Sequence, residues 1–217
     1  VLDLDDDGNP LVGASDGTAD EEAADGDASD GDPAGAGDAD AAAEDGAVAP
    51  TTDPTPTTTT TVPMSGMIAV GDSVMLGAAQ ELSDLGFVVD AAESRAWVNG
   101  LDYVQRLGQQ GRLPETMLIH LGTNGPIGQT DMDRMMIAVE DVPRVIMMTI
   151  DVDRDYTAGN NALIIDAASR FDNVEFVDWQ GLVPDCPGDC LEADGYHLTP
   201  DGREYYADGV EFSLNSG

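Results

Sequence analysis

Two short segments far apart in the chain carry the side chains of a serine nucleophile and its base. Ser73 follows an apolar run and a Gly-Asp pair, and Asp194 stands three residues before His197. A serine hydroxyl becomes a nucleophile when a histidine takes its proton, and an aspartate holds that imidazole in the required tautomer. The chain has only two histidines, so His197 has one competitor for the role of base. Each motif alone also fits an ordinary structure, because serine often caps a helix and aspartate often caps a turn.

The rest of residues 64–217 must supply the elements that bring these side chains together. Five short apolar runs predict buried strands, over 67–70, 87–89, 116–121, 144–150 and 174–177. Helical patterns alternate with them, over 73–85, 97–111, 131–139, 161–171 and 200–210. Near-continuous apolar strands joined through helices are typical of a parallel sheet covered on both faces. With right-handed crossovers, this pattern predicts an α/β domain with three layers, α/β/α, around a five-stranded parallel sheet.

Ligands of such sheets bind beyond the carboxyl ends of the strands. Ser73, Asn124 and the loop after Val177 all fall at such ends. Ser73 also begins a predicted helix, where free backbone N–H groups and the helix dipole stabilise a developing oxyanion. The Asn124 amide can donate to the same oxyanion, although Asn before Gly is also a common turn. His120 lies inside an apolar strand run, which predicts a packed core residue rather than a base.

Composition divides the chain at residue 63. Residues 1–63 hold 17 acidic and no basic residues and end in a Thr/Pro run. A segment with so few large apolar side chains cannot offset its chain entropy, so we expect a disordered acidic tail and a semi-extended linker. Residues 64–217 have the length and apolar content of one domain.

Charge and hydropathy exclude several functions. The chain has a formal net charge of −35, and residues 64–217 are acidic in their own right. Such a surface repels phosphate backbones, so we expect no nucleic-acid partner. No apolar run is long enough to span a bilayer. The chain opens without a Met or a basic region, which is typical of a fragment of a longer protein or a processed product.

The two cysteines, Cys186 and Cys190, lie close together in the sequence Cys-Pro-Gly-Asp-Cys. A local disulfide would indicate an oxidising compartment, and two free thiols in a loop are the alternative. A zinc site would need further ligands from His120 or His197 without supporting spacing, so we expect no metal.

The motifs together resemble those of the SGNH (GDSL-type) hydrolase family. Gly71-Asp72-Ser73 is similar to the first sequence block of that family, Gly122-Thr123-Asn124 to the third, and Asp194-Gly195-Tyr196-His197-Leu198 to the fifth. The resemblance covers roughly residues 67–210. It implies a flavodoxin-like sheet in which Ser73, Asp194 and His197 form a catalytic triad.

The second block departs from the usual pattern of the family, which places a glycine there as an oxyanion donor. Here the stretch contains Ser94-Arg95, a form that resembles the SGNH domains behind membrane-embedded acyltransferase-3 domains. The resemblance implies that the Ser94 N–H takes the glycine role, with Gly100 as a second candidate. It implies that Arg95 orients the loop or binds an acyl or glycan oxygen, and an ion pair with a nearby Asp or Glu is the alternative.

This resemblance implies serine acyl-ester chemistry without a metal or bound cofactor. The expected function is that of the extracytoplasmic domain of an O-acetyltransferase, tethered to a membrane part, that uses an acyl donor and acts on cell-wall or surface glycan. A secreted esterase or lipase acting on a small ester is the second reading. A glycan-binding or structural module that has lost the chemistry is the third.

Overall fold

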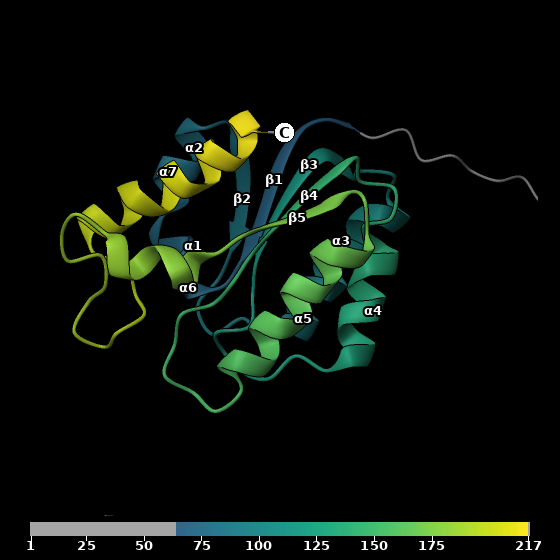
Figure 1. Cartoon of the computed structure of the whole chain (residues 1–217). Helices are drawn as coiled ribbons and strands as arrows, with labels where there is room; N and C mark the ends of the chain where they lie inside the picture. Colours follow the sequence, from purple (N-terminus) through teal and green to yellow (C-terminus); the bar gives the residue numbers. More distant parts are fainter. Residues whose placement is uncertain (1–63, 217) are drawn as a thin grey trace, which may run out of the picture. The chain divides into compact units, whose positions relative to one another are not determined.

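The computed structural model describes residues 64–216, and the predicted disordered tail and linker over 1–63 lie outside the described residues. Five strands form one parallel sheet in the order β2-β1-β3-β4-β5 (Figure 1). Their bounds are β1 Met64–Gly71, β2 Phe87–Ala91, β3 Pro114–His120, β4 Arg144–Met148 and β5 Val174–Val177. The prediction of a five-stranded parallel α/β fold is therefore confirmed.

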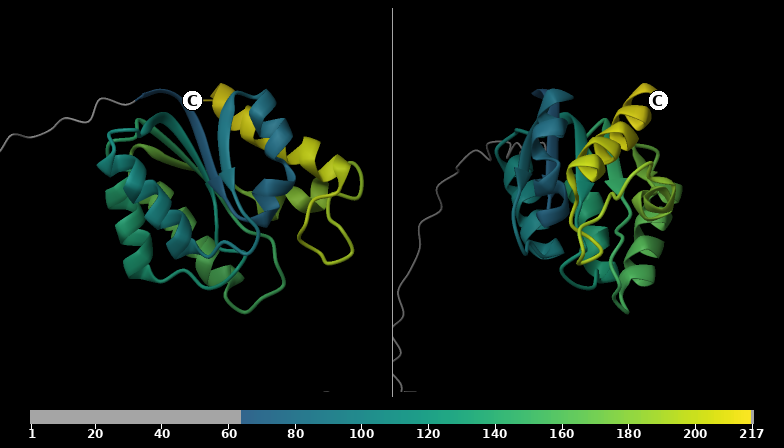
Figure 2. Two further views of the ribbon diagram at one scale, coloured as in Figure 1. Left: turned by 180° about the vertical axis from the view of Figure 1, so that it is seen from behind. Right: turned by 90° about the vertical axis from the view of Figure 1, so that its left-hand side faces the viewer.

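Helices cover both faces of the sheet, as the two further views show (Figure 2). Their bounds are α1 Ser73–Gly77, α2 Ala79–Asp84, α3 Trp97–Gln109, α4 Gln129–Ala138, α5 Thr157–Arg170, α6 Trp179–Leu182, the 3₁₀ turn η1 Val183–Asp185, and α7 Pro200–Ser216. One apolar core joins α3, α4 and α5 to one face, and a second joins α1, α2, α6 and α7 to the other. Alternate residues of the three central strands, β1, β3 and β4, enter opposite cores; in β3, Met117 and Ile119 face the first and Leu118 the second. This arrangement explains why the strands read as continuous apolar runs.

Three predicted helices differ from those in the structure. The helix expected over 73–85 is broken at Ala78, whose φ of −98° and ψ of 17° lie outside the helical range. The small pair Gly77-Ala78 forms the break, and glycine disfavours a helix interior. Helix α5 begins at Thr157, four residues before the expected start, and α7 continues to Ser216. The short helix α6 and the η1 turn were not predicted, because four-residue segments carry no helical period.

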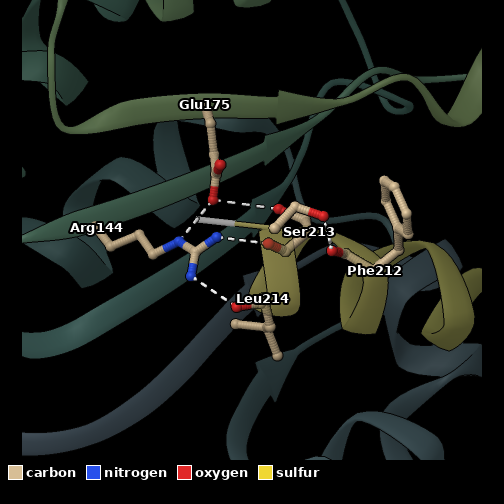
Figure 3. A network of polar contacts seen from close by, with 6 residues as sticks. Arg144, Glu175, Phe212, Ser213 and Leu214 are labelled. Atoms are coloured by element: carbon tan, nitrogen blue, oxygen red, sulfur yellow. Dashed lines mark hydrogen bonds and ion pairs between the residues drawn. The ribbon is translucent and has the colours of Figure 1, made fainter.

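The amino edge of the sheet is closed by an ionic network around Arg144 at the start of β4 (Figure 3). The guanidinium contacts Glu175 of β5 at 2.6 Å and donates to the carbonyls of Ser213 and Leu214 at 2.6 and 3.1 Å. Those carbonyls belong to the last turn of α7, which has no intrahelical donors for them. The arginine therefore ties β4 and β5 to the end of α7, on the side of the sheet opposite the candidate site.

Among residues 64–216, no helix is long and apolar enough to cross a membrane. The strand order changes direction at β1: β2 lies on one side of it, and β3, β4 and β5 follow in turn on the other side. A crevice beyond the carboxyl ends of such strands is the usual ligand site of this architecture.

Candidate active site

Three side chains from the two ends of the domain form a hydrogen-bonded relay. Ser73 begins α1 directly after β1, and Asp194 and His197 lie in the loop between η1 and α7. The Ser73 Oγ lies 3.0 Å from His197 Nε2, and the His197 Nδ1 lies 2.7 Å from Asp194 Oδ2. The geometry is that of a nucleophile, a general base and a carboxylate that orients the base.

Local backbone contacts give Asp194 its orientation. Its Oδ1 accepts the N–H groups of Tyr196 and His197 at 3.2 and 3.1 Å, while Oδ2 faces the imidazole. Gly195, at φ +82°, makes the tight turn that brings the carboxylate over these N–H groups. The hydrogen bond from the His197 side chain, and then that from its backbone, hold the pKa of Asp194 below the ordinary value of 3.8. The carboxylate therefore stays ionised at neutral pH and matches an imidazolium.

The loop that carries His197 is anchored at its base. Leu191 and Leu198 form an antiparallel bridge, and the Glu192 N–H donates to the His197 carbonyl at 2.8 Å. A disulfide joins Cys186 to Cys190, and the Thr199 N–H donates to the Cys190 carbonyl at 3.0 Å. Both ends of the His197 segment are therefore tied to the cross-linked turn.

Asp72, fully buried, fixes the turn that presents Ser73. Its Oδ1 accepts the Val74 N–H at 3.1 Å and so caps α1, and its Oδ2 accepts the Thr123 N–H at 3.3 Å. The backbone N–H of Asp72 donates to the His120 carbonyl at 3.1 Å. One carboxylate thus joins the loop after β1 to the loop after β3. Our reading of the sequence assigned no role to Asp72, although aspartate before a helix is a recognised capping signal.

A cavity of about 470 Å³ opens in front of the serine. Its lining comes from α1, from the loops after β2 and β3, and from the loop before α7. The lining residues are Ser73, Leu76, Gly77, Glu93, Ser94, Asn124, Tyr196 and His197. Ser94 has a φ of +54°, the one non-glycine residue with positive φ among residues 64–216. Such a conformation costs about 1–3 kcal/mol and is found most often at functional sites. Sequence reasoning did not assign Leu76, Glu93 or Tyr196 to the site, and only the fold places them on this cavity.

Asn124 reaches the same cavity from the loop after β3. Its Nδ2 donates to the Arg95 carbonyl at 3.3 Å. An amide nitrogen has two N–H groups, so one of them is left for a ligand in the cavity. The structure therefore places Ser94 and Asn124 on the same cavity as Ser73.

Two expected site residues lie elsewhere. The Arg95 guanidinium binds Asp90, with 2.6 Å to the carboxylate and 2.6 Å to the carbonyl, and Arg95 does not line the cavity. Its place in the structure corresponds to the ion-pair alternative and to the loop-orienting role. Gly100 lies buried inside α3, where its N–H donates to the Ala96 carbonyl and its Cα packs against Leu121. That N–H is used within the helix, so the structure provides no second oxyanion donor at Gly100.

His120, the other histidine, is 1 % exposed at the end of β3. Its Nδ1 lies 2.8 Å from the Tyr206 hydroxyl, and burial lowers the pKa of the imidazole below the ordinary 6.5. This side chain is packed in the core beneath the site and has no contact with Ser73 in the hydrogen-bond network.

A larger cavity, of about 630 Å³, lies between β5 and α7. Ser73, Asp194 and His197 do not line this cavity, so we do not assign it as the reaction site although it is the larger of the two. Among residues 64–216, no group of three or more His, Cys, Asp or Glu side chains is arranged to hold a metal ion.

Known proteins resemble this chain in sequence and in fold. No family model matches the chain. The O-acetyltransferase OatA of Staphylococcus aureus is 26% identical over 154 residues, a match that covers 66% of this chain and 24% of the relative. The chain therefore spans about a quarter of the length of the curated relatives it matches.

Solved structures show the same fold. The C-terminal catalytic domain of the peptidoglycan O-acetyltransferase OatA of Streptococcus pneumoniae, determined as a methylsulfonyl adduct, superposes with a TM-score of 0.62 at 22% identity, covering 71% of this chain and 95% of that one. A putative acylhydrolase of Bacteroides fragilis superposes with a TM-score of 0.55 at 16% identity, covering 69% and 86%. These likenesses show that the chain has the fold of the SGNH (GDSL-type) hydrolases and is similar in sequence and in fold to OatA.

Proposed function

We propose that this chain transfers acyl groups through an ester on Ser73, as the extracytoplasmic domain of an O-acetyltransferase that acts on cell-wall or surface glycan. The observation that carries the proposal is the relay, with 3.0 Å from Ser73 Oγ to His197 Nε2 and 2.7 Å from His197 Nδ1 to Asp194 Oδ2. The likeness to proteins named O-acetyltransferase supports the acetyl group and the hydroxyl acceptor.

The reaction proceeds in two halves. In the first, His197 Nε2 takes the proton of Ser73 Oγ as that oxygen attacks the carbonyl carbon of the acyl donor. The tetrahedral intermediate collapses, the bond to the leaving oxygen breaks, and His197 returns the proton to that oxygen. In the second half, His197 deprotonates the acceptor hydroxyl, which attacks the ester carbonyl and releases Ser73 with its proton restored.

The oxyanion of each intermediate needs hydrogen-bond donors aimed at the cavity. We assign this role to the backbone N–H groups of Ser73 and Ser94 and to the free N–H of the Asn124 amide. Removing one such donor costs about 10²- to 10³-fold in kcat in serine hydrolases. Asp194 stabilises the imidazolium that forms in both halves.

The larger assembly is also a proposal. Because the chain matches only 24% of the length of its curated relatives, we propose that a membrane-embedded acyltransferase domain precedes it and supplies the acyl donor. Residues 1–63 would connect the two parts. The Cys186–Cys190 disulfide is consistent with an oxidising compartment outside the cytoplasm.

A second candidate is ester hydrolysis, and the exposure of the site favours it. The side chains of His197 and Asp194 are 39% and 42% exposed, so water has access to the region where the acyl-enzyme forms. Transfer would then require that the bound acceptor displaces this water from the acyl-enzyme.

The test uses p-nitrophenyl acetate with and without a glycan acceptor, on the wild type and Ser73→Ala. We expect the wild type to release p-nitrophenol, Ser73→Ala to fall to the uncatalysed rate, and O-acetylated sugar to form with the acceptor. Acetate alone, with any glycan acceptor, would instead support the esterase. Equal turnover by Ser73→Ala would eliminate the relay chemistry, and a wild-type rate no higher than the uncatalysed rate would leave a binding or structural module.

A further inference from the structure

The loop after β3, Gly122 to Ile127, is held by a single buried amide from the start of α5. The Asn160 Oδ1 accepts the Ile127 N–H at 2.7 Å, and its Nδ2 donates to the carbonyls of Gly122 and Gly125, each at 3.0 Å. Asn160 is 1 % exposed, and all three contacts go to backbone groups. The amide therefore joins the two ends of the loop and one point beside its tip.

A second side chain of the same segment fixes the residue before Asn124. The Tyr156 hydroxyl donates to the Thr123 carbonyl at 2.7 Å, while Asp72 accepts the Thr123 N–H from the other side. The backbone is thus bound at the carbonyl immediately before Asn124 and at the Gly125 carbonyl immediately after it.

The Asn124 side chain has no comparable support. It is exposed, and among the described residues its side chain makes a single hydrogen bond, of 3.3 Å, to the Arg95 carbonyl. Its position is therefore set by its backbone, which Asn160 and Tyr156 hold. An oxyanion donor acts through preorganisation, and a displacement of about 1 Å can cost on the order of 10²-fold in rate.

We propose that Asn160 and Tyr156 are positioning residues that fix the Asn124 amide for oxyanion binding, an inference that rests on the acyl-transfer function proposed above. They contact neither the cavity nor the relay, and act through the backbone of the Gly122–Ile127 loop. Asparagine and tyrosine have many structural uses, so only the contacts of Asn160 and Tyr156 reveal the role.

The experiment measures kcat and KM for p-nitrophenyl acetate in the full 217-residue chain. We expect Asn160→Ala to lower kcat about 10- to 100-fold with KM changed less than about twofold. Tyr156→Phe, which removes one hydroxyl, is expected to lower kcat about 3- to 10-fold and provides a folded variant should Asn160→Ala fail to fold.

Asn161→Ala is the matched control. The neighbouring Asn161 is also buried on α5 and also makes three hydrogen bonds, but these go to Ile150 and Gln180, which do not line the cavity. We expect it to lower the melting temperature as Asn160→Ala does, while kcat stays within about twofold of the wild type.

The decisive measurement is a double-mutant cycle with Asn124→Ala. If the two residues act through Asn124, Asn160→Ala and Tyr156→Phe each change kcat less than about twofold once the Asn124 amide is absent. The same loss in both backgrounds, or a kcat equal to that of Asn161→Ala, overturns the positioning role while leaving the Ser73 chemistry intact. Turnover that persists in Ser73→Ala overturns the proposed function and the positioning role together.

Discussion

Changing Asp194 to Asn keeps the shape of the side chain and removes its charge. The Oδ1 position receives two backbone N–H groups, so we expect the asparagine oxygen to remain there. The amide NH₂ then takes the Oδ2 position, 2.7 Å from His197 Nδ1. To accept that N–H, Nδ1 must be unprotonated, and the proton moves to Nε2. This is the nitrogen that has to accept the proton of Ser73, so the base is blocked.

The size of the effect follows from two contributions. A hydrogen bond to a charged group contributes about 1.5–3 kcal/mol, and reversing the tautomer against the asparagine amide costs about one further hydrogen bond, near 1 kcal/mol. The sum of about 2.5–4 kcal/mol corresponds to roughly 10²- to 10³-fold in rate. The same change in a buried triad costs about 10⁴-fold; here the side chains are 39% and 42% exposed, and water replaces part of the lost interaction.

The assay is kcat/KM for p-nitrophenyl acetate between pH 6 and 9, with circular dichroism to show that the variant is folded. Glu192→Gln is the control, because it neutralises an exposed carboxylate in the same loop without touching the relay. We expect Asp194→Asn to lose about 10²- to 10³-fold and Glu192→Gln to stay within about twofold. A folded Asp194→Asn within threefold of the wild type would refute the role of the carboxylate.

Three further predictions concern the core and the loop around the site. Burial lowers the pKa of the His120 imidazole in the folded protein, whereas the unfolded imidazole titrates near 6.5. Unfolding below that pH therefore takes up a proton. The free energy of unfolding should fall on acidification from pH 6.5 to 5, by at most about 1.4 kcal/mol per pH unit. His120→Gln should lack this slope in urea unfolding; an equal slope in both proteins would assign it elsewhere. Gly100→Ala places a methyl group against buried Leu121 and should lower stability by about 1–2 kcal/mol, seen as a lower melting temperature, while kcat well below it stays within about twofold. A loss of kcat without loss of stability would restore a catalytic role for that position. Replacing Cys186 and Cys190 by serine should cost about 2 kcal/mol, or roughly 4–8 °C by calorimetry. An unchanged melting temperature would show that the cross-link contributes nothing to the fold.

Local signals in the sequence are sufficient for the architecture and for the relay residues. Apolar runs alternating with helical patterns require a covered parallel sheet, because no other arrangement buries such strands on both faces. The carboxyl ends of those strands place Ser73 and Asn124 at one edge before any contact is known. With two histidines in the chain and one of them inside a strand run, His197 was the remaining base.

Residue type and spacing do not determine the contacts between distant segments. Arg95 is equally suited to a substrate or to a carboxylate, and only the end of β2 shows that Asp90 binds it. Gly100 has the residue type of an oxyanion donor, yet its place inside α3 commits its N–H to the helix.

The chemistry that we propose for this protein could be inferred from its sequence, because a serine nucleophile requires a few side-chain types at strand ends and turns, where local patterns identify them. The residues that hold the site loops in place could be identified only from the tertiary structure. Asp72 reaches Thr123 and Asn160 reaches Ile127 across 51 and 33 residues of chain. Aspartate, asparagine and tyrosine have many ordinary uses, so their part in holding the Asn124 loop appears only once folding has brought those backbone groups within hydrogen-bond distance.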